Sequence, residues 1–383
     1  MKLKSWEIKS LGEIAEFING RAFKPTEWDN KGLPIIRIQN LTGSSSEYNY
    51  FNGEIESKYL VNKLDILISW SASLDVYIWQ GESAVLNQHI FKVNIVDNVD
   101  RLFFFYLIKT KIREMLSNVH GSTMKHINKD RFENIKTLLP SYTVQKQISE
   151  ILEKAGKARQ KRKEANKLTE QFLQSAFIEM FGDPVNNPKR WKVVTLGSLC
   201  SKITDGTHVT PKYQNEGIKF ISAKNIKKSL IDWSDIKYIS EKEHNLLHKR
   251  CNPERGDILL TKSGSLGVAA FVNVDFEFSL FESLALLKFD DKIINGQFLT
   301  FLINNESFRS YNQKAIRGIS IRHLHLNEIS KFNIIVPEHS LQEKFANIVI
   351  KTEALKEKQK QSEQELENLF NSLMQKAFKG DLF

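Results

Sequence analysis

The sequence predicts two α/β (α+β) domains separated by two long helices that pack as an antiparallel coiled coil. Three observations lead to this fold class. The chain of 383 residues contains the same pattern twice, short β-like runs alternate with amphipathic helix patterns inside each copy, and each copy ends in a long segment with helical spacing. Such an internal repeat implies a pseudo-two-fold relation between the copies.

The repeat covers almost the whole chain, at an offset that drifts only from 185 to 197 residues. The matched segments are WEIKSLGEIAEFING (6–20) with WKVVTLGSLCSKITDG (191–206), PIIRIQNL (34–41) with KFISAKNI (219–226), LDILISWSASLD (64–75) with GDILLTKSGSLG (256–267), FFFYLI (103–108) with FLTFLI (298–303), and TLLPSYTVQKQISEIL (137–152) with IIVPEHSLQEKFANIV (334–349). The runs IIRIQ, DILIS, FISA, DILLT and NIIV have the composition of short strands, whereas RLFFFYLIKTKIREML has a helical pattern.

Each copy ends in a predicted helix, one over 143–180 and the other over 341–378. The first has no Pro and a single Gly, and FGDP (181–184) supplies its stop signal. Apolar residues recur at a 3/4 spacing toward both ends of each helix, as in a coiled-coil seam. The middle of the seam is polar, with Arg159 and Arg162 in one helix and Gln359 and Ser362 in the other. A simple dimerisation coil is the alternative interpretation.

The predicted domain organisation follows from these segments: a first α/β domain over 1–142, a central helix over 143–185, a second α/β domain over 186–338 and a C-terminal helix over 339–383.

Composition limits the class of protein. The chain is 41% hydrophobic, has only two cysteines and carries a formal net charge of +10, with 22 Lys/Arg against 15 Asp/Glu in residues 186–337. Two cysteines exclude a disulfide framework, and no apolar run is long enough to span a membrane. We expect a cytoplasmic protein, and the basic surplus favours a polyanionic partner such as nucleic acid.

Motifs that would support catalysis are missing from the sequence. It contains no Walker A pattern, no GxSxG elbow, no HExxH helix, and no cysteine cluster with metal-ligand spacing. KSGSLG (262–267) has glycines but lacks the Lys-Ser/Thr that would reach a phosphate, so a turn at the end of a strand is predicted there. We therefore expect no catalytic residues, no metal site and no cofactor bound by this chain.

One polar segment is repeated, as GSTMKHIN (121–128) and GISIRHLH (318–325). Glycine frees the backbone, the hydroxyls and the base suit a phosphate, and histidine can hydrogen-bond a base edge. The segments are predicted nucleic-acid contacts. A capped helix start with solvated basic side chains is the alternative.

The order of domain, long helix, domain, long helix resembles the specificity subunit of type I restriction–modification enzymes. The opening WxxxxLG of each half, DGTH (205–208), FISAKNI, GDILLTKSGSLG and the P-(x)4-Q entry to each helix fit this family. The resemblance implies a non-catalytic subunit that binds double-stranded DNA, each domain reading one half of an asymmetric bipartite target. It also implies that the helices set the spacer and dock two methyltransferase subunits, with a motor-nuclease subunit joining for cleavage.

In such a complex the partners use S-adenosylmethionine, ATP and Mg²⁺. A system whose partner fuses methyltransferase and nuclease, and a coiled-coil scaffold without a DNA role, are the alternatives. The first half departs from the pattern, since NGRAFKP (19–25) stands opposite DGTHVTP and WSASLD lacks both glycines.

The residues predicted to contact DNA are the polar side chains of the repeated motifs. They are Arg37, Gln39, Asn40, Ser69, Ser71, Ser122, Thr123, Lys125, His126, Thr207, His208, Lys224, Asn225, Thr261, Lys262, Ser263, Ser320, Arg322 and His323.

Overall fold

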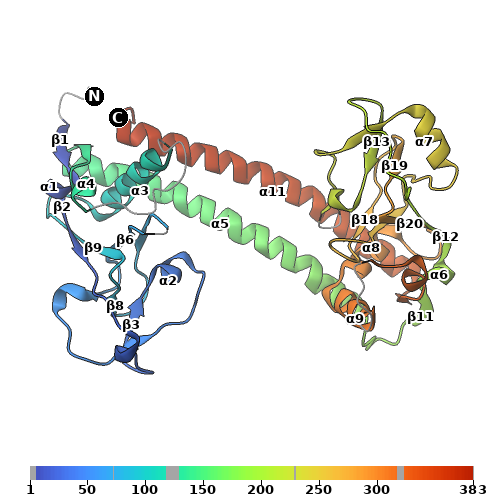
Figure 1. Cartoon of the computed structure of the whole chain (residues 1–383), viewed down its shortest axis with the longest axis horizontal. Coiled ribbons are helices and arrows are strands. Elements are labelled where there is room, and N and C mark those ends of the chain that lie inside the picture. The colour runs from blue at the N-terminus through green and yellow to red at the C-terminus, as the bar shows by residue number, and fades with distance from the viewer. Residues whose placement is uncertain (1–5, 72, 118–128, 228–229, 317–322, 383) are drawn as a thin grey trace. The chain divides into compact units, whose positions relative to one another are not determined.

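The computed structural model describes residues 6–71, 73–117, 129–227, 230–316 and 323–382 (Figure 1). By contact density the chain divides into two compact units: Met1–Lys163 with Gln361–Phe383, and Glu164–Lys360. Each long helix therefore contributes one part to each unit. We call the strand-rich parts head 1 (residues 6–139, in the first unit) and head 2 (residues 191–336, in the second unit).

Head 1 is built from two four-stranded sheets and a short strand pair. The larger sheet is antiparallel, in the order β2 (Ala15–Asn19), β9 (Ile90–Ile95), β6 (Ile66–Ser69) and β7 (Asp75–Ile78). The smaller sheet has the order β4 (Tyr50–Phe51), β3 (Leu33–Ile36), β8 (Ala84–Leu86) and β5 (Leu60–Val61), with β3 and β8 parallel. The pair joins β1 (Glu7–Ser10) to β10 (Lys136–Leu139).

Head 2 repeats this topology, except that its smaller sheet has three strands instead of four. Its larger sheet has the order β12 (Cys200–Asp205), β20 (Leu284–Phe289), β17 (Ile258–Thr261) and β18 (Ala269–Phe271). The smaller sheet has the order β16 (Lys237–Ile239), β13 (Ile218–Ile221) and β19 (Phe278–Leu280), with β13 and β19 parallel, and β11 (Lys192–Thr195) pairs with β21 (Asn333–Val336). An antiparallel pair of short strands, β14 (Ile226–Lys227) and β15 (Leu230–Ile231), is added. The predicted α+β class and internal repeat are confirmed.

A β-bulge accounts for a drift in the repeat offset. The register of β12 on β20 shifts between Cys200 and Lys202, whereas β2 pairs with β9 without interruption. The extra residue of the bulge is the additional residue in WKVVTLGSLCSKITDG. Beyond the bulge, Asn19 opposite Phe91 and Asp205 opposite Ala285 are structurally equivalent.

The remaining helices and 3-10 turns of the heads lie between and beside these strands. In head 1 they are α1 (Leu11–Ile14), η2 (Pro25–Glu27), α2 (Ile38–Thr42), η3 (Ser57–Tyr59), α3 (Arg101–Ser117) and α4 (Lys129–Glu133). In head 2 they are α6 (Leu196–Leu199), η4 (Ala223–Asn225), α7 (Glu241–His248), α8 (Gly296–Asn304), α9 (Glu306–Ile316) and α10 (Leu326–Ile329). The helical pattern at 101–116 forms α3, which buries Phe103, Phe104 and Leu107.

The two predicted long helices are α5 (Tyr142–Phe181) and α11 (His339–Lys379). Each begins with a buried glutamine that binds the head beside it. Gln145 accepts from the Asp100 amide at 2.8 Å and donates to the Pro140 carbonyl at 2.9 Å. Gln342 makes the same two bonds, to Asn295 and Pro337, both at 2.8 Å. The repeated P-(x)4-Q motif is therefore a device that fixes a helix start.

Within each unit the two helices pack antiparallel, as predicted. In the first unit, Arg159 pairs with Glu367 and lies 4.2 Å from the Phe370 ring centre. In the second unit, Gln359 donates to the Thr169 hydroxyl at 2.9 Å. Arg159 and Gln359 in the polar middle of the seam are therefore paired with the opposite helix, whereas Nε of Arg162 is buried without a hydrogen-bond partner among the described residues.

The helix ends are part of the cores. Ile148, Leu152, Phe370 and Met374 join the core of head 1. Phe177, Phe181 and Phe345 pack with α8 in the second unit, with Phe181 and Phe298 ring centres 4.7 Å apart. None of the helices among the residues given above has the length and apolar character required to cross a membrane.

Candidate nucleic-acid interface

The most concentrated polar cluster of head 2 lies where β12 ends, at the DGTH motif. Asp205, the last residue of the strand, is only 4% exposed. Its Oδ2 lies 2.5 Å from Nζ of Lys262, which is 7% exposed, and 3.2 Å from Nε2 of His208. Its Oδ1 lies 3.2 Å from Nη2 of Arg250. One buried carboxylate thus faces three basic side chains.

Electrostatics keep this carboxylate ionised. Burial alone would raise the pKa of Asp205, but the hydrogen bond and charge of Lys262, with the charges of His208 and Arg250, outweigh it. The pKa of Asp205 is lowered from its ordinary value. Asp205 therefore remains an anion at neutral pH and serves as a fixed partner for the basic side chains around it.

Backbone hydrogen bonds bring four loop segments together around this cluster. The Lys262 amide donates to the Ser283 carbonyl, and the Lys262 carbonyl accepts from the Leu324 amide, both at 2.8 Å. Glu282 donates its amide to the Thr207 carbonyl at 3.0 Å, and Ser263 forms an isolated β-bridge with His323. The segments 205–208, 262–264, 281–283 and 323–325 thus form one edge of head 2.

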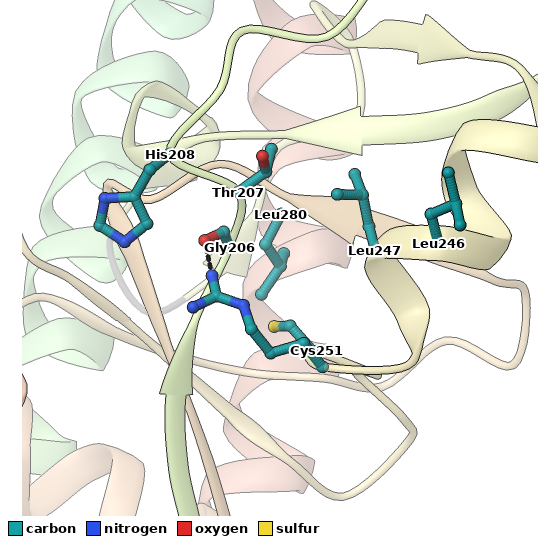
Figure 2. A pocket seen from close by; sticks show the side chains of 8 residues that line it. Gly206, Thr207, His208, Leu246, Leu247, Cys251 and Leu280 are labelled. Atoms are coloured by element: carbon teal, nitrogen blue, oxygen red, sulfur yellow. Dashed lines mark hydrogen bonds between the residues drawn. The ribbon is translucent and has the colours of Figure 1, made fainter.

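A pocket of about 320 Å³ opens beside the DGTH loop (Figure 2). Leu246 and Leu247 of α7, together with Leu280 and Cys251, provide apolar walls, while Thr207 and His208 line the other side. Burial raises the pKa of the Cys251 thiol to about 11, so this thiol is neutral at physiological pH. The pocket combines apolar walls with a basic, hydrogen-bonding rim.

Head 1 has different chemistry at the same strand ends. The register places Asn19 where head 2 has Asp205, and Trp70 where head 2 has Lys262. Trp70 packs against His89 and Phe91, at ring-centre distances of 5.3 and 5.8 Å. The buried ion pair is therefore specific to head 2.

Only the glycine of the motif is shared between the two edges. A Cβ on Gly20 would lie 2.1 Å from the Asn87 carbonyl oxygen, and one on Gly206 would lie 2.0 Å from that of Leu280. The amide that follows each glycine donates to the neighbouring strand: Arg21 to the Leu86 carbonyl at 2.8 Å, and Thr207 to the Leu280 carbonyl at 3.0 Å. Glycine is required at both places because no side chain fits.

Several predicted contact residues are engaged in the fold instead. Asn225 is 2% exposed; its Oδ1 accepts from the Ser222 amide at 3.0 Å and its amide group donates to the Asp235 carbonyl at 2.9 Å. Asn40 repeats this arrangement, accepting from the Arg37 amide at 2.9 Å and donating to the Glu47 carbonyl at 2.8 Å.

Other predicted contacts are buried for related reasons. Ser69 and Thr261 are both 0% exposed, and each closes a turn by donating to a carbonyl four residues ahead. Ser71 is also buried, and Lys262 is held by Asp205. Burial and hydrogen bonds within the fold do not favour contact with a ligand at these positions, and their role at DNA stays a prediction.

The predicted residues that remain accessible fall into two groups. Head 2 brings Thr207, His208, Ser263 and His323 to its edge, whereas Lys224 lies on η4 and pairs with Asp235 at 3.1 Å. In head 1, Gln39 is exposed, and the Arg37 guanidinium lies 4.4 Å from the Trp28 ring centre. Outside the described residues lie Ser122, Thr123, Lys125, His126, Ser320 and Arg322.

Arg250 is a candidate residue that the sequence did not indicate. It follows α7 in a segment without a repeat counterpart, so no pattern singled it out. Within the part of the chain that the structure describes, no group of three His, Cys, Asp or Glu side chains could hold a metal ion.

Comparison with known proteins gives a consistent family. The model of the type I restriction modification DNA specificity domain matches twice, at residues 4–170 and 188–368. The EcoBI specificity subunit of Escherichia coli is 22% identical, covering 99% of this chain and 86% of that protein. The MjaVIII specificity subunit of Methanocaldococcus jannaschii is 23% identical, covering 99% and 93%.

Two solved structures share the fold. The type I restriction-modification S subunit from M. genitalium superposes with a TM-score of 0.59 at 14% identity, covering 98% of this chain and 96% of that one. A chain from a study of type I R-M complex assembly and conformational transition gives 0.61 at 18% identity, covering 99% and 98%. With both copies of the specificity domain present, this chain belongs to the type I restriction–modification DNA specificity family.

Proposed function

We propose that this chain is the DNA-recognition subunit of a type I restriction–modification complex. Each head reads one half of an asymmetric, bipartite double-stranded target. The observation that carries the proposal is that two copies of one specificity domain share their strand order yet carry different side chains at the same strand ends. Equal scaffolds with unequal edges suit two different half-sites.

The accessible side chains at these edges have suitable chemistry. Arginine binds guanine or phosphate through paired donors, glutamine can pair with adenine, and histidine can donate or accept at a base edge. In head 2 we assign this role to Arg250, His208 and His323, and in head 1 to Arg37 and Gln39. Thr207, Ser263 and Lys224 provide further polar contacts, and Lys125 and Arg322 remain proposed contacts.

The partners are methyltransferase subunits, two in the full complex, and a motor-nuclease subunit for cleavage. Exposed apolar side chains on the helices support docking. Leu168 and Phe172 lie one turn apart on α5 and are 64% and 53% exposed, and Ile350 on α11 is 54% exposed. The partners, not this chain, use S-adenosylmethionine, ATP and Mg²⁺, and this chain contributes recognition without catalysis.

The test is reconstitution with type I methyltransferase subunits. We expect the complex to methylate one asymmetric bipartite sequence, and to bind it with an affinity that falls steeply with salt, about 0.9 log units per log unit of salt for each phosphate contact. Lys125→Ala or Arg322→Ala should weaken binding. Turnover of S-adenosylmethionine by the isolated chain, or a complex without sequence preference, would contradict the proposal; the latter result favours a scaffold.

A further inference from the structure

We propose that Asp205 is a positioning residue that fixes Arg250 and His208 at the edge of head 2. DNA recognition by head 2, but not by head 1, then depends on this one buried carboxylate. This inference rests on the proposed function and adds a specific arrangement to it. Arg250 and His208 are the groups that contact DNA, and Asp205 acts through them.

The geometry around Arg250 supports this assignment. Its Nη2 faces Asp205 Oδ1 at 3.2 Å, donates to the Asp205 carbonyl at 2.9 Å and also donates to the Gly206 carbonyl. One nitrogen thus anchors the guanidinium, while the side chain remains 55% exposed. The other nitrogens of the planar group keep their donors for a ligand, and an arginine held in one orientation loses less entropy on binding.

His208 is held by the second oxygen of the same carboxylate. Its Nε2 lies 3.2 Å from Asp205 Oδ2, and the side chain is 61% exposed. A carboxylate partner at one ring nitrogen fixes the orientation of the imidazole and leaves Nδ1 for another partner. Both exposed basic side chains therefore face the same buried carboxylate, Arg250 through an ion pair and His208 through a hydrogen bond.

The ion pair of Asp205 with Lys262 is not required by the fold. Head 1 forms the same four-stranded sheet with Asn19 and Trp70 at the equivalent positions. Burying two charges costs free energy that their attraction often only balances, so such a pair is weak evidence for a stabilising role. What the pair provides in head 2 is a buried, ionised carboxylate that faces the exposed Arg250 and His208 and is balanced in charge by Lys262.

Two substitutions separate positioning from simple stability. Lys262→Met and Asp205→Asn each break the buried ion pair, but only Asp205→Asn removes the negative charge that faces Arg250 and His208. The double variant Asp205→Asn/Lys262→Met removes both buried charges and should fold as stably as the original chain. Asn19→Ala is the matched control in head 1.

The experiment uses the complex reconstituted with its methyltransferase subunits and the duplex sequence that the wild-type complex is found to methylate. Three probes are compared: the intact duplex and two duplexes in which one or the other half-site is scrambled. Thermal unfolding of each complex is measured in parallel. We expect Asp205→Asn and the double variant to bind the intact duplex about ten- to a hundredfold more weakly and to lose discrimination at one half-site only.

Lys262→Met should lower the thermal midpoint while keeping discrimination at both half-sites. Asn19→Ala should keep full discrimination at the half-site where Asp205→Asn loses it. The inference is overturned if the double variant reads the target as the wild type does, if both half-sites relax equally, or if loss of binding only follows loss of stability. A wild-type complex without sequence-selective binding would instead refute the proposed function, whatever the variants do.

Discussion

Asp205 and Asp257 are both buried in head 2, and their pKa values move in opposite directions. For Asp257, burial dominates over the hydrogen bond from Lys288 at 2.8 Å, and its pKa is raised. For Asp205, the effects of Lys262, His208 and Arg250 outweigh the effect of burial, and its pKa is lowered. The contributions of the two aspartates to folding stability therefore change with pH in opposite directions. Substitution of one of them is needed to measure the contribution of either.

The lowered pKa of Asp205 gives a prediction for acid unfolding. A carboxyl with a lower pKa in the folded state contributes stability above its unfolded pKa of about 3.9, and loses it as the pH falls through the folded value. Without Lys262, burial opposes the charged form of Asp205, which keeps only Arg250 and His208, each at 3.2 Å. The thermal midpoint of Lys262→Met should therefore lie below that of Asp205→Asn/Lys262→Met at neutral pH, and the gap should close as the pH falls toward about 4, the pKa of an unfolded aspartate. A gap that is independent of pH would show that Asp205 is not ionised in this variant.

Asn225 provides a second prediction at this scale, because its buried side chain makes three part-buried hydrogen bonds to backbone groups. Asn225→Ala should leave these groups without partners at a cost of roughly 1–3 kcal/mol, which lowers the thermal midpoint by several degrees. Asn40→Ala should act similarly in head 1. Asn215→Ala, at an exposed position, is the control. If Asn225→Ala changes the sequence read without changing stability, the residue contacts DNA as the sequence first suggested.

The contrast between Asn225 and Arg250 explains what the sequence could predict at the site. A repeat search finds polar residues present in both copies, and those are the residues that the shared fold needs, as Asn40 and Asn225 illustrate. Residues that read different half-sites must differ between copies, so a repeat cannot reveal them. His208 was found through its motif, whereas Arg250 became apparent only when the fold placed it beside Asp205.

At the scale of elements, substitution of two glycines by alanine should have opposite effects on stability. One is Gly206, at the end of β12, and the other is Gly156, within α5. Gly206→Ala would place a Cβ 2.0 Å from a backbone oxygen, which cannot move cheaply. We expect a loss of about 3 kcal/mol or more, and the same for Gly20→Ala. Gly156→Ala in α5 would find its nearest atom, the Tyr106 hydroxyl, at 3.4 Å. It should stabilise the first unit by about 0.5–1 kcal/mol. Thermal unfolding of the three variants tests both signs; equal effects would contradict the close-approach argument.

The helices and the strands of the larger sheets were predictable because each has a strong local pattern. DILIS and DILLT form β6 and β17, and the two Pro-free segments form α5 and α11 with boundaries within a few residues. IIRIQ was only partly correct, since β3 ends at Ile36 and α2 begins at Ile38. The backbone turns there because Asn40 caps the start of α2, a hydrogen bond that periodicity does not reveal.

For the whole molecule, the two units divide within the long helices, near Lys163 in α5 and near Gln361 in α11. Residues added at these two points extend the helices without entering either compact unit. Four added residues make one turn, about 6 Å, and base pairs follow each other every 3.4 Å or so. If the helices set the spacing of the half-sites, a matched four-residue insertion in both helices should lengthen the unread spacer by one or two base pairs. Genome-wide mapping of methylated sites measures this.

Both half-site sequences should stay unchanged, since Asp205, Arg250 and the other edge residues keep their surroundings. The same insertion in the exposed turn at Asp290–Asp291 is the control and should leave the spacer as it was. New half-site sequences with an unaltered spacer would mean that the heads, rather than the helices, determine the spacing.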